Sequence, residues 1–136
     1  SAAARVSRLP AGNAITDGKA LLRYALPIDN KPVREMQASL EDIATQLRAN
    51  RRWSAISSDI SKASSILSTP DKLLASVPED KKPQAEAVIA QLQEQLNSLR
   101  SATEAQDKEQ IAQERSKALN LVGQLEEYMV QKFPYE

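Results

Sequence analysis

Three basic side chains, Arg48, Arg51 and Arg52, precede the single tryptophan of the chain, Trp53. Guanidinium groups stay charged at physiological pH and bind carboxylates through two parallel hydrogen bonds. A cluster of them is therefore a candidate site for docking on an acidic partner surface. Cations near the end of a helix also complement its dipole, which gives the cluster an equally good structural explanation. We expect Trp53 itself to close one end of the core.

The residue types that most catalysis needs are missing. The 136 residues include no His and no Cys, which removes the usual general base, the commonest metal ligand and the thiol nucleophile. Neighbouring carboxylates such as Glu41 and Asp42 point about 100° apart on a helix, which favours solvated faces. No glycine-rich phosphate-binding motif occurs. The sequence predicts a protein that is not an enzyme and has no cofactor and no catalytic or metal site.

Charge is balanced overall but unevenly distributed along the chain. Eighteen Lys and Arg residues match eighteen Asp and Glu residues. Residues 1–53 hold nine basic and five acidic residues, a net charge of +4, and residues 54–136 therefore carry −4. This balance does not favour nucleic-acid binding, because such domains are usually strongly basic. The asymmetry indicates either one polarised docking face or a solvated surface of no special function.

Apolar residues at spacings of three and four predict two helices in the first half of the chain. Residues 1–30 are instead expected to form an irregular N-terminal arm, since they contain two of the seven prolines and two of the three glycines. The first helix should begin near Asn30 to Pro32, with Asn as its N-cap. The second should begin near Trp53 and end near Pro70, followed by a short helical piece. The predicted core rows are Val33, Met36, Leu40, Ile43 and Leu47, then Trp53, Ile56, Ile60, Ala63 and Leu67.

Two further helices are expected in the second half. The third should begin between Pro78 and Pro83, and the fourth at a capping box made by Thr103 and Gln106. Their predicted core rows are Ala85, Val88, Ile89, Leu92, Leu96, Leu99 and Ala102, then Ile111, Ala118, Val122, Leu125 and Met129. Arg115 should extend to the edge of the last row. Asp59 on the second helix is expected to pair with Lys62.

Four amphipathic helices joined by short connections predict an all-α, four-helix up-and-down bundle over residues 31–136. A dimeric coiled coil is the main rival architecture. Prolines interrupt the heptads, and no pattern continues for more than about three heptads, which argues against that rival.

The chain resembles the PsbQ family, extrinsic lumenal subunits of photosystem II, and in particular its cyanobacterial lipoprotein form. The resemblance rests on Arg51-Arg52-Trp53 with Asp59-Ile60 and on the Lys-rich connection between Pro78 and Pro83. It also rests on the run from Ser101 to Ala105 and on the residues around Leu125. It covers roughly residues 31–132.

The resemblance implies a non-catalytic protein of the thylakoid lumen that docks on the lumenal face of photosystem II and stabilises its oxygen-evolving side. Its partners would be the photosystem II core and other extrinsic subunits, with Arg48, Arg51 and Arg52 contributing to docking. Cyanobacterial members are attached to the membrane through a lipidated N-terminal Cys. This chain has no Cys, so either it begins after that residue or the anchor is absent.

A second hypothesis comes from the fold alone. A helical adaptor or scaffold unrelated to photosynthesis could hold partner helices in its apolar grooves. A signal peptide with a lipidated Cys upstream would favour the lumenal hypothesis, and a plain initiating Met would favour the adaptor.

Overall fold

The computed structural model describes residues 30–49 and 53–129. Within them are four long helices: α3 (Lys31–Arg48), α4 (Trp53–Leu67), α6 (Lys82–Glu104) and α7 (Lys108–Glu127). A short helix, α5 (Pro70–Leu74), and one turn of 3-10 helix (Glu79–Lys81) connect α4 to α6. The predicted all-α bundle is confirmed. The predicted arm, apart from Asn30, lies outside the described residues.

Asn30 begins α3 as the sequence predicts, and it also holds α5 in place. Its side-chain oxygen accepts from the Val33 amide over 3.1 Å, which satisfies one of the free N–H groups of the first turn. Its Nδ2 donates to the carbonyls of Lys72 and Leu73 and to the Ser76 hydroxyl, over 3.0 to 3.3 Å. One buried amide therefore fixes both the start of α3 and the end of α5.

The prolines have the predicted effects. Pro70 is the first residue of α5, where its missing N–H leaves no hydrogen bond unmade. Pro78 precedes the 3-10 turn, and Pro83 lies in the first turn of α6. The start of α6 at Lys82 falls within the predicted interval. Leu73, Leu74 and Val77 are buried, so the connection packs against the bundle.

The predicted capping box at Thr103 and Gln106 is wrong. Thr103 is buried in the last turn of α6, and its hydroxyl donates to the Leu99 carbonyl over 2.8 Å. Gln106 follows with φ of 55°, and the amides of Gln106 and Asp107 donate back to the carbonyls of Thr103 and Ala102. This is the Schellman termination of a helix. The N-cap of α7 is Asp107, whose carboxylate accepts from the Gln110 amide over 3.1 Å.

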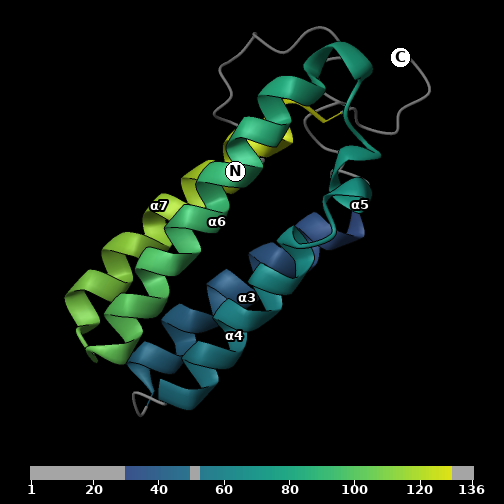
Figure 1. The fold of residues 1–136 in the computed structure, drawn as a ribbon. Coiled ribbons are helices and arrows are strands. Elements are labelled where there is room, and N and C mark those ends of the chain that lie inside the picture. Colours follow the sequence, from purple (N-terminus) through teal and green to yellow (C-terminus); the bar gives the residue numbers. More distant parts are fainter. Residues whose placement is uncertain (1–29, 50–52, 130–136) are drawn as a thin grey trace, which may run out of the picture. The chain divides into compact units, whose positions relative to one another are not determined.

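The four long helices pack in a ring (Figure 1). α3 contacts α4, α4 contacts α6, α6 contacts α7, and α7 returns to contact α3. Among the described residues, no Cα atom of α3 lies within 8 Å of one in α6, and none of α4 lies that close to one in α7. Sequential neighbours joined by short connections run antiparallel, which gives the predicted up-and-down topology.

The core is built almost entirely from the predicted rows. All of their members are buried except Leu47 and Trp53, which are half-buried near the end where α3 leads into α4. Each fully buried Leu or Ile contributes about 1.5 to 3 kcal/mol to folding. The largest side chains of the core with under 2 % exposure are Met36, Leu40, Ile43, Ile56, Ile60, Leu67, Leu73, Leu92, Leu96, Leu99, Ile111 and Leu125.

Candidate docking surface

The candidate binding cluster lies at the end of the bundle where α3 leads into α4. Arg48 is in the last turn of α3 and is exposed, so its guanidinium can complement the helix dipole and still meet a partner. Arg51 and Arg52 lie outside the described residues. The structure therefore places one member of the predicted cluster, and the docking role of all three stays a prediction.

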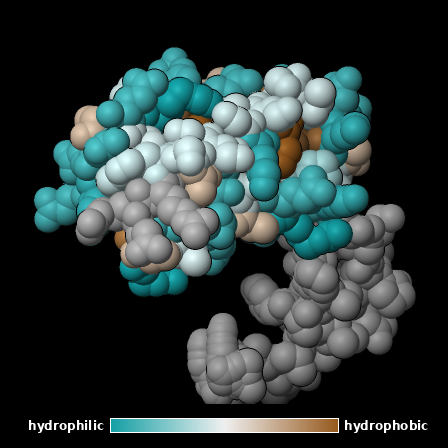
Figure 2. Space-filling view, turned by 90° about the horizontal axis from the view of Figure 1, so that it is seen from below, coloured by the Kyte–Doolittle hydropathy of each residue, from teal (hydrophilic) through white to brown (hydrophobic). Residues whose placement is uncertain are grey.

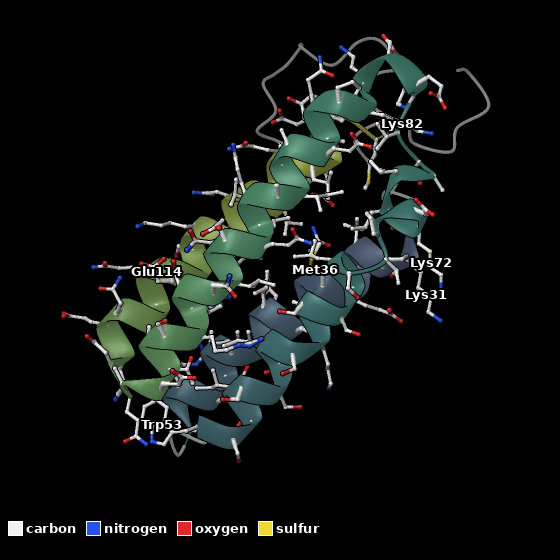
Figure 3. The ribbon with its side chains drawn as sticks, viewed as in Figure 1. Lys31, Met36, Trp53, Lys72, Lys82 and Glu114 are labelled. Carbon is white, nitrogen blue, oxygen red and sulfur yellow. The ribbon has the colours of Figure 1, made fainter. Side chains whose placement is uncertain are left out.

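Trp53, the first residue of α4, lies at the same end (Figure 3). Its side chain is half-buried rather than enclosed. The indole can therefore cover the end of the core and still offer an aromatic surface at the end of the bundle that also carries Arg48. Tryptophan and arginine are, with tyrosine, enriched among the residues that dominate binding at protein interfaces.

The face of the molecule that is seen from below is mainly hydrophilic. Figure 2 views the molecule from below, and the coloured atoms are mostly teal and white, with brown confined to small areas. A surface of this kind suits polar and electrostatic docking better than the burial of a large apolar partner.

A second group of basic side chains lies at the other end of the bundle. Figure 3 shows Lys31, Lys72 and Lys82 far from Trp53. Lys82 Nζ lies 2.8 Å from Glu79 Oε2, and the hydrogen bond and charge of this lysine lower the pKa of Glu79. Part of the positive charge at this end is thus already paired within the molecule.

The outer seam between α3 and α4 carries an open groove. Two adjoining hollows of about 460 and 400 Å³ share Glu35, Ser65 and Ile66 in their walls. Lys62 lines one hollow, and Lys31 and Lys72 line the other. Ligand pockets for small molecules are usually enclosed and mostly apolar. This groove is open and lined by charged and hydroxyl side chains, so it does not resemble such a pocket.

Two buried acidic side chains were not expected from the sequence. Asp59 and Glu114 are 5 % and 6 % exposed. Glu114 accepts hydrogen bonds from the side chains of Gln95 on α6 and Gln110 on α7, and Lys117 Nζ lies 3.7 Å from it. The sequence did contain a signal for the burial of Glu114, because this residue follows the core residue Ile111 by three positions and precedes Ala118 by four.

The predicted pairing of Asp59 with Lys62 is wrong. Asp59 forms a hydrogen bond with the Asp42 carboxyl group across the contact between α3 and α4. Burial is the main cause that raises the pKa of Asp59, to about 7, and the hydrogen bond with Asp42 and its charge add to it. Asp59 lies three residues after Ile56 and four before Ala63, so it is on the buried face of α4 and cannot be solvated as Lys62 is.

The described residues do not form a candidate metal site. No three of their His, Cys, Asp or Glu side chains come together in a group that could hold an ion. Also among these residues, no helix combines the length and the apolar character needed to cross a membrane. The described residues offer an exposed arginine at one end, an open groove and two buried acids.

Comparison with known protein families shows the family to which this chain belongs. Residues 17–130 match the model of the PsbQ-like domain of peptidyl-prolyl cis-trans isomerase CYP38-like proteins. This chain belongs to that family. The predicted resemblance to PsbQ is therefore right at the level of the domain. It is wrong in pointing to the lipoprotein form, because the relatives of this PsbQ-like domain carry the names of isomerases.

Two relatives illustrate the relationship. The chain is 49% identical over 128 residues to a putative thylakoid lumen peptidyl-prolyl cis-trans isomerase of Synechocystis. It is 36% identical over 134 residues to the chloroplastic peptidyl-prolyl cis-trans isomerase CYP38 of Arabidopsis thaliana. These matches cover 93% and 96% of this chain but only 34% and 31% of the relatives. The PsbQ-like domain thus spans about a third of their length.

The names of these relatives confirm the predicted compartment at the level of the family. One relative is named for the thylakoid lumen and the other for the chloroplast. The isomerase activity in both names refers to chains about three times as long, so it is not evidence of catalysis by this PsbQ-like domain.

Proposed function

We propose that this PsbQ-like domain is a non-catalytic docking module of the thylakoid lumen that attaches to the lumenal face of photosystem II. The family match over residues 17–130 carries the proposal, because PsbQ proteins are extrinsic subunits of that complex. In relatives named as isomerases, such a domain would attach the rest of the chain to photosystem II. We further propose that the docked domain stabilises the oxygen-evolving side of the complex.

The surface proposed for docking is the end of the bundle marked by Arg48 and Trp53, together with Arg51 and Arg52. This choice is supported by the exposed Arg48 in the last turn of α3 and the half-buried Trp53 in the first turn of α4. Electrostatic docking predicts binding that weakens as salt rises, since the Debye length falls to about 8 Å at 0.15 M ionic strength. The lipidated Cys expected from the lipoprotein form is not part of this proposal.

The test is binding of the tagged chain to photosystem II membranes stripped of their extrinsic proteins. Reversal of Arg48, Arg51 and Arg52 to Glu should weaken binding by about tenfold or more, equivalent to about 1.4 kcal/mol. The matched control reverses Lys31, Lys72 and Lys81, which are exposed at the opposite end. Circular dichroism should show equal helicity in both variants.

The control variant should bind like the wild type. Equal binding of the arginine variant and the wild type would reject the proposed site. Failure of the wild type to bind would reject docking on photosystem II altogether.

The non-catalytic part of the proposal has its own test. The chain alone should not accelerate cis-trans isomerisation of a proline-containing peptide, which takes tens to hundreds of seconds uncatalysed. A rate that rises with the concentration of the chain would contradict this. The helical adaptor unrelated to photosynthesis has less support, because both relatives are named for the chloroplast or its lumen.

A further inference from the structure

Asp59 occupies a position on α4 that is suited to an apolar residue. It lies on the face that carries Ile56, Ile60 and Ala63, which are fully buried, and it is itself 5 % exposed. A charged carboxylate in such a place is costly unless a cation or several hydrogen bonds compensate for it. Neither is present among the described residues: Asp59 forms no ion pair, and its Oδ2 has no hydrogen-bond partner.

The partner that Asp59 does have is another acid. Asp42, half-buried on α3, forms a hydrogen bond with Asp59 across the seam and accepts a second from Gln46 Nε2 over 3.2 Å. Two ionised carboxylates cannot hydrogen-bond to each other, because both are acceptors only. This contact therefore needs one proton, shared between α3 and α4.

The environment assigns the proton to Asp59. Burial, then the hydrogen bond and charge of Asp42, raise the pKa of Asp59 to about 7, whereas the hydrogen bond from Asp59 is the main cause that lowers the pKa of Asp42. Asp42 is the more accessible of the two and keeps the Gln46 amide as a donor. The pair therefore holds one negative charge and one proton at mildly acidic pH.

Few other charges of the described residues act on this pair. Lys62, exposed on α4, lowers the pKa of both groups through space and is a lesser influence on each. On α6, the Arg100 guanidinium donates instead to the Ser64 hydroxyl over 3.3 Å. On α5, Asp71 and Lys72 are exposed beyond the C-terminal end of α4. Among the described residues, compensating charge near the pair is therefore slight.

We propose that Asp42 and Asp59 form a proton-dependent clasp, which holds α3 and α4 together while it carries a proton and loosens their contact when it loses it. The folded chain binds this proton more tightly than the unfolded chain does. The contribution of this proton to stability is therefore fully present below about pH 4 and is lost as the pH rises to about 7. The hairpin that the clasp closes carries Arg48 and Trp53 at its end.

The significance of the clasp rests on the proposed lumenal function, because the lumen is the compartment that acidifies when thylakoids are illuminated. The clasp itself is a property of the isolated chain, so its test requires no photosystem.

The test is amide hydrogen exchange of the wild-type chain between pH 5.5 and pH 8, corrected for the intrinsic dependence of exchange on pH. Protection of α3 and α4 should fall by about tenfold or more over this range relative to α6 and α7, which corresponds to one pKa unit of linkage. Asp59→Asn, which mimics the protonated acid, should remove this fall. Asp42→Asn, the matched control, should shift the fall in protection to lower pH, because the negative charge of Asp42 no longer raises the pKa of Asp59.

A second measurement does not depend on the variants folding. The carboxyl carbon of Asp59 in the wild-type chain should titrate by NMR near neutral pH, well above an ordinary aspartate. Titration near 4, or protection of α3 and α4 that is unchanged between pH 5.5 and pH 8, would overturn the proposal. Either result would leave docking on photosystem II unaffected, and failure of docking would leave the clasp intact.

Discussion

Arg115 on α7 donates from Nε to the main-chain carbonyl of Leu40 on α3, over 2.6 Å. The sequence predicts an arginine at the edge of the core, with its charge in water. The structure instead uses the charge to link the first and last long helices, which no short connection joins. A second link, from Gln37 Nε2 to Glu126 Oε2 over 2.9 Å, joins the same two helices. Side chains thus provide the polar contacts between α3 and α7.

Arg115→Met should test the strength of this link, because methionine keeps much of the apolar stem and removes the donor. Hydrogen bonds that involve a charged group are worth about 1.5 to 3 kcal/mol, so we expect the free energy of unfolding to fall by about that amount. Urea denaturation followed by circular dichroism measures the change. The exposed Gln113→Met, also on α7, is the control and should change stability by less than about 0.5 kcal/mol. Equal stability of the two variants would show that the contact contributes nothing.

Glu114 should be needed for the packing of α6 on α7. Glu114→Ala removes the acceptor for the Gln95 and Gln110 amides and should lower the free energy of unfolding by about 2 to 3 kcal/mol. Glu114→Gln keeps the volume and one acceptor oxygen, so it should cost about 1 kcal/mol. Thermal unfolding measures both effects. A Glu114→Ala variant as stable as the wild type would contradict this account.

Asn30 should couple the start of α3 to α5 through its donor group. Asn30→Asp keeps an oxygen for the Val33 amide but loses the donor to the Lys72 and Leu73 carbonyls. We expect faster amide exchange in α5 and the residues after it, at Ala75 and Val77, with α7 unchanged. Asn97→Asp, at an exposed site in α6, is the control. Unchanged exchange at Ala75 in the Asn30 variant would argue against the coupling.

Gln106→Gly should stabilise the protein. Gln106 has φ of 55° at the end of α6, a conformation that glycine adopts without the steric cost that other residues bear. We expect a gain of about 0.5 to 1 kcal/mol in the free energy of unfolding. Gln106→Val, β-branched and poorly suited to positive φ, should instead destabilise the turn. Chemical denaturation of both variants measures the difference, and a loss of stability in the glycine variant would exclude strain at this position.

Local signals in the sequence were enough to predict most helix starts and the core. Asn30 before Lys31 and Pro32, and Pro70 after Thr69, act through neighbouring backbone groups and need no tertiary contact. The start of the third long helix could be placed only within an interval, between Pro78 and Pro83. The fourth was predicted wrongly, because Thr103 and Gln106 fit a capping box in spacing alone. The buried Thr103 hydroxyl instead donates within α6, and the turn closes at Gln106.

By itself the sequence determined the four amphipathic stripes, the lack of the usual catalytic side chains and the PsbQ-like character of the chain. Only the tertiary structure decided which polar residues on those stripes are buried and what they bind. Periodicity places Asp59, Glu114 and Arg115 on or beside a core-facing row, but it does not tell which atom of the next helix each one meets. That partner depends on how the helices are rotated and shifted against one another. A buried polar group is stabilised only where this packing supplies a donor, an acceptor or a shared proton.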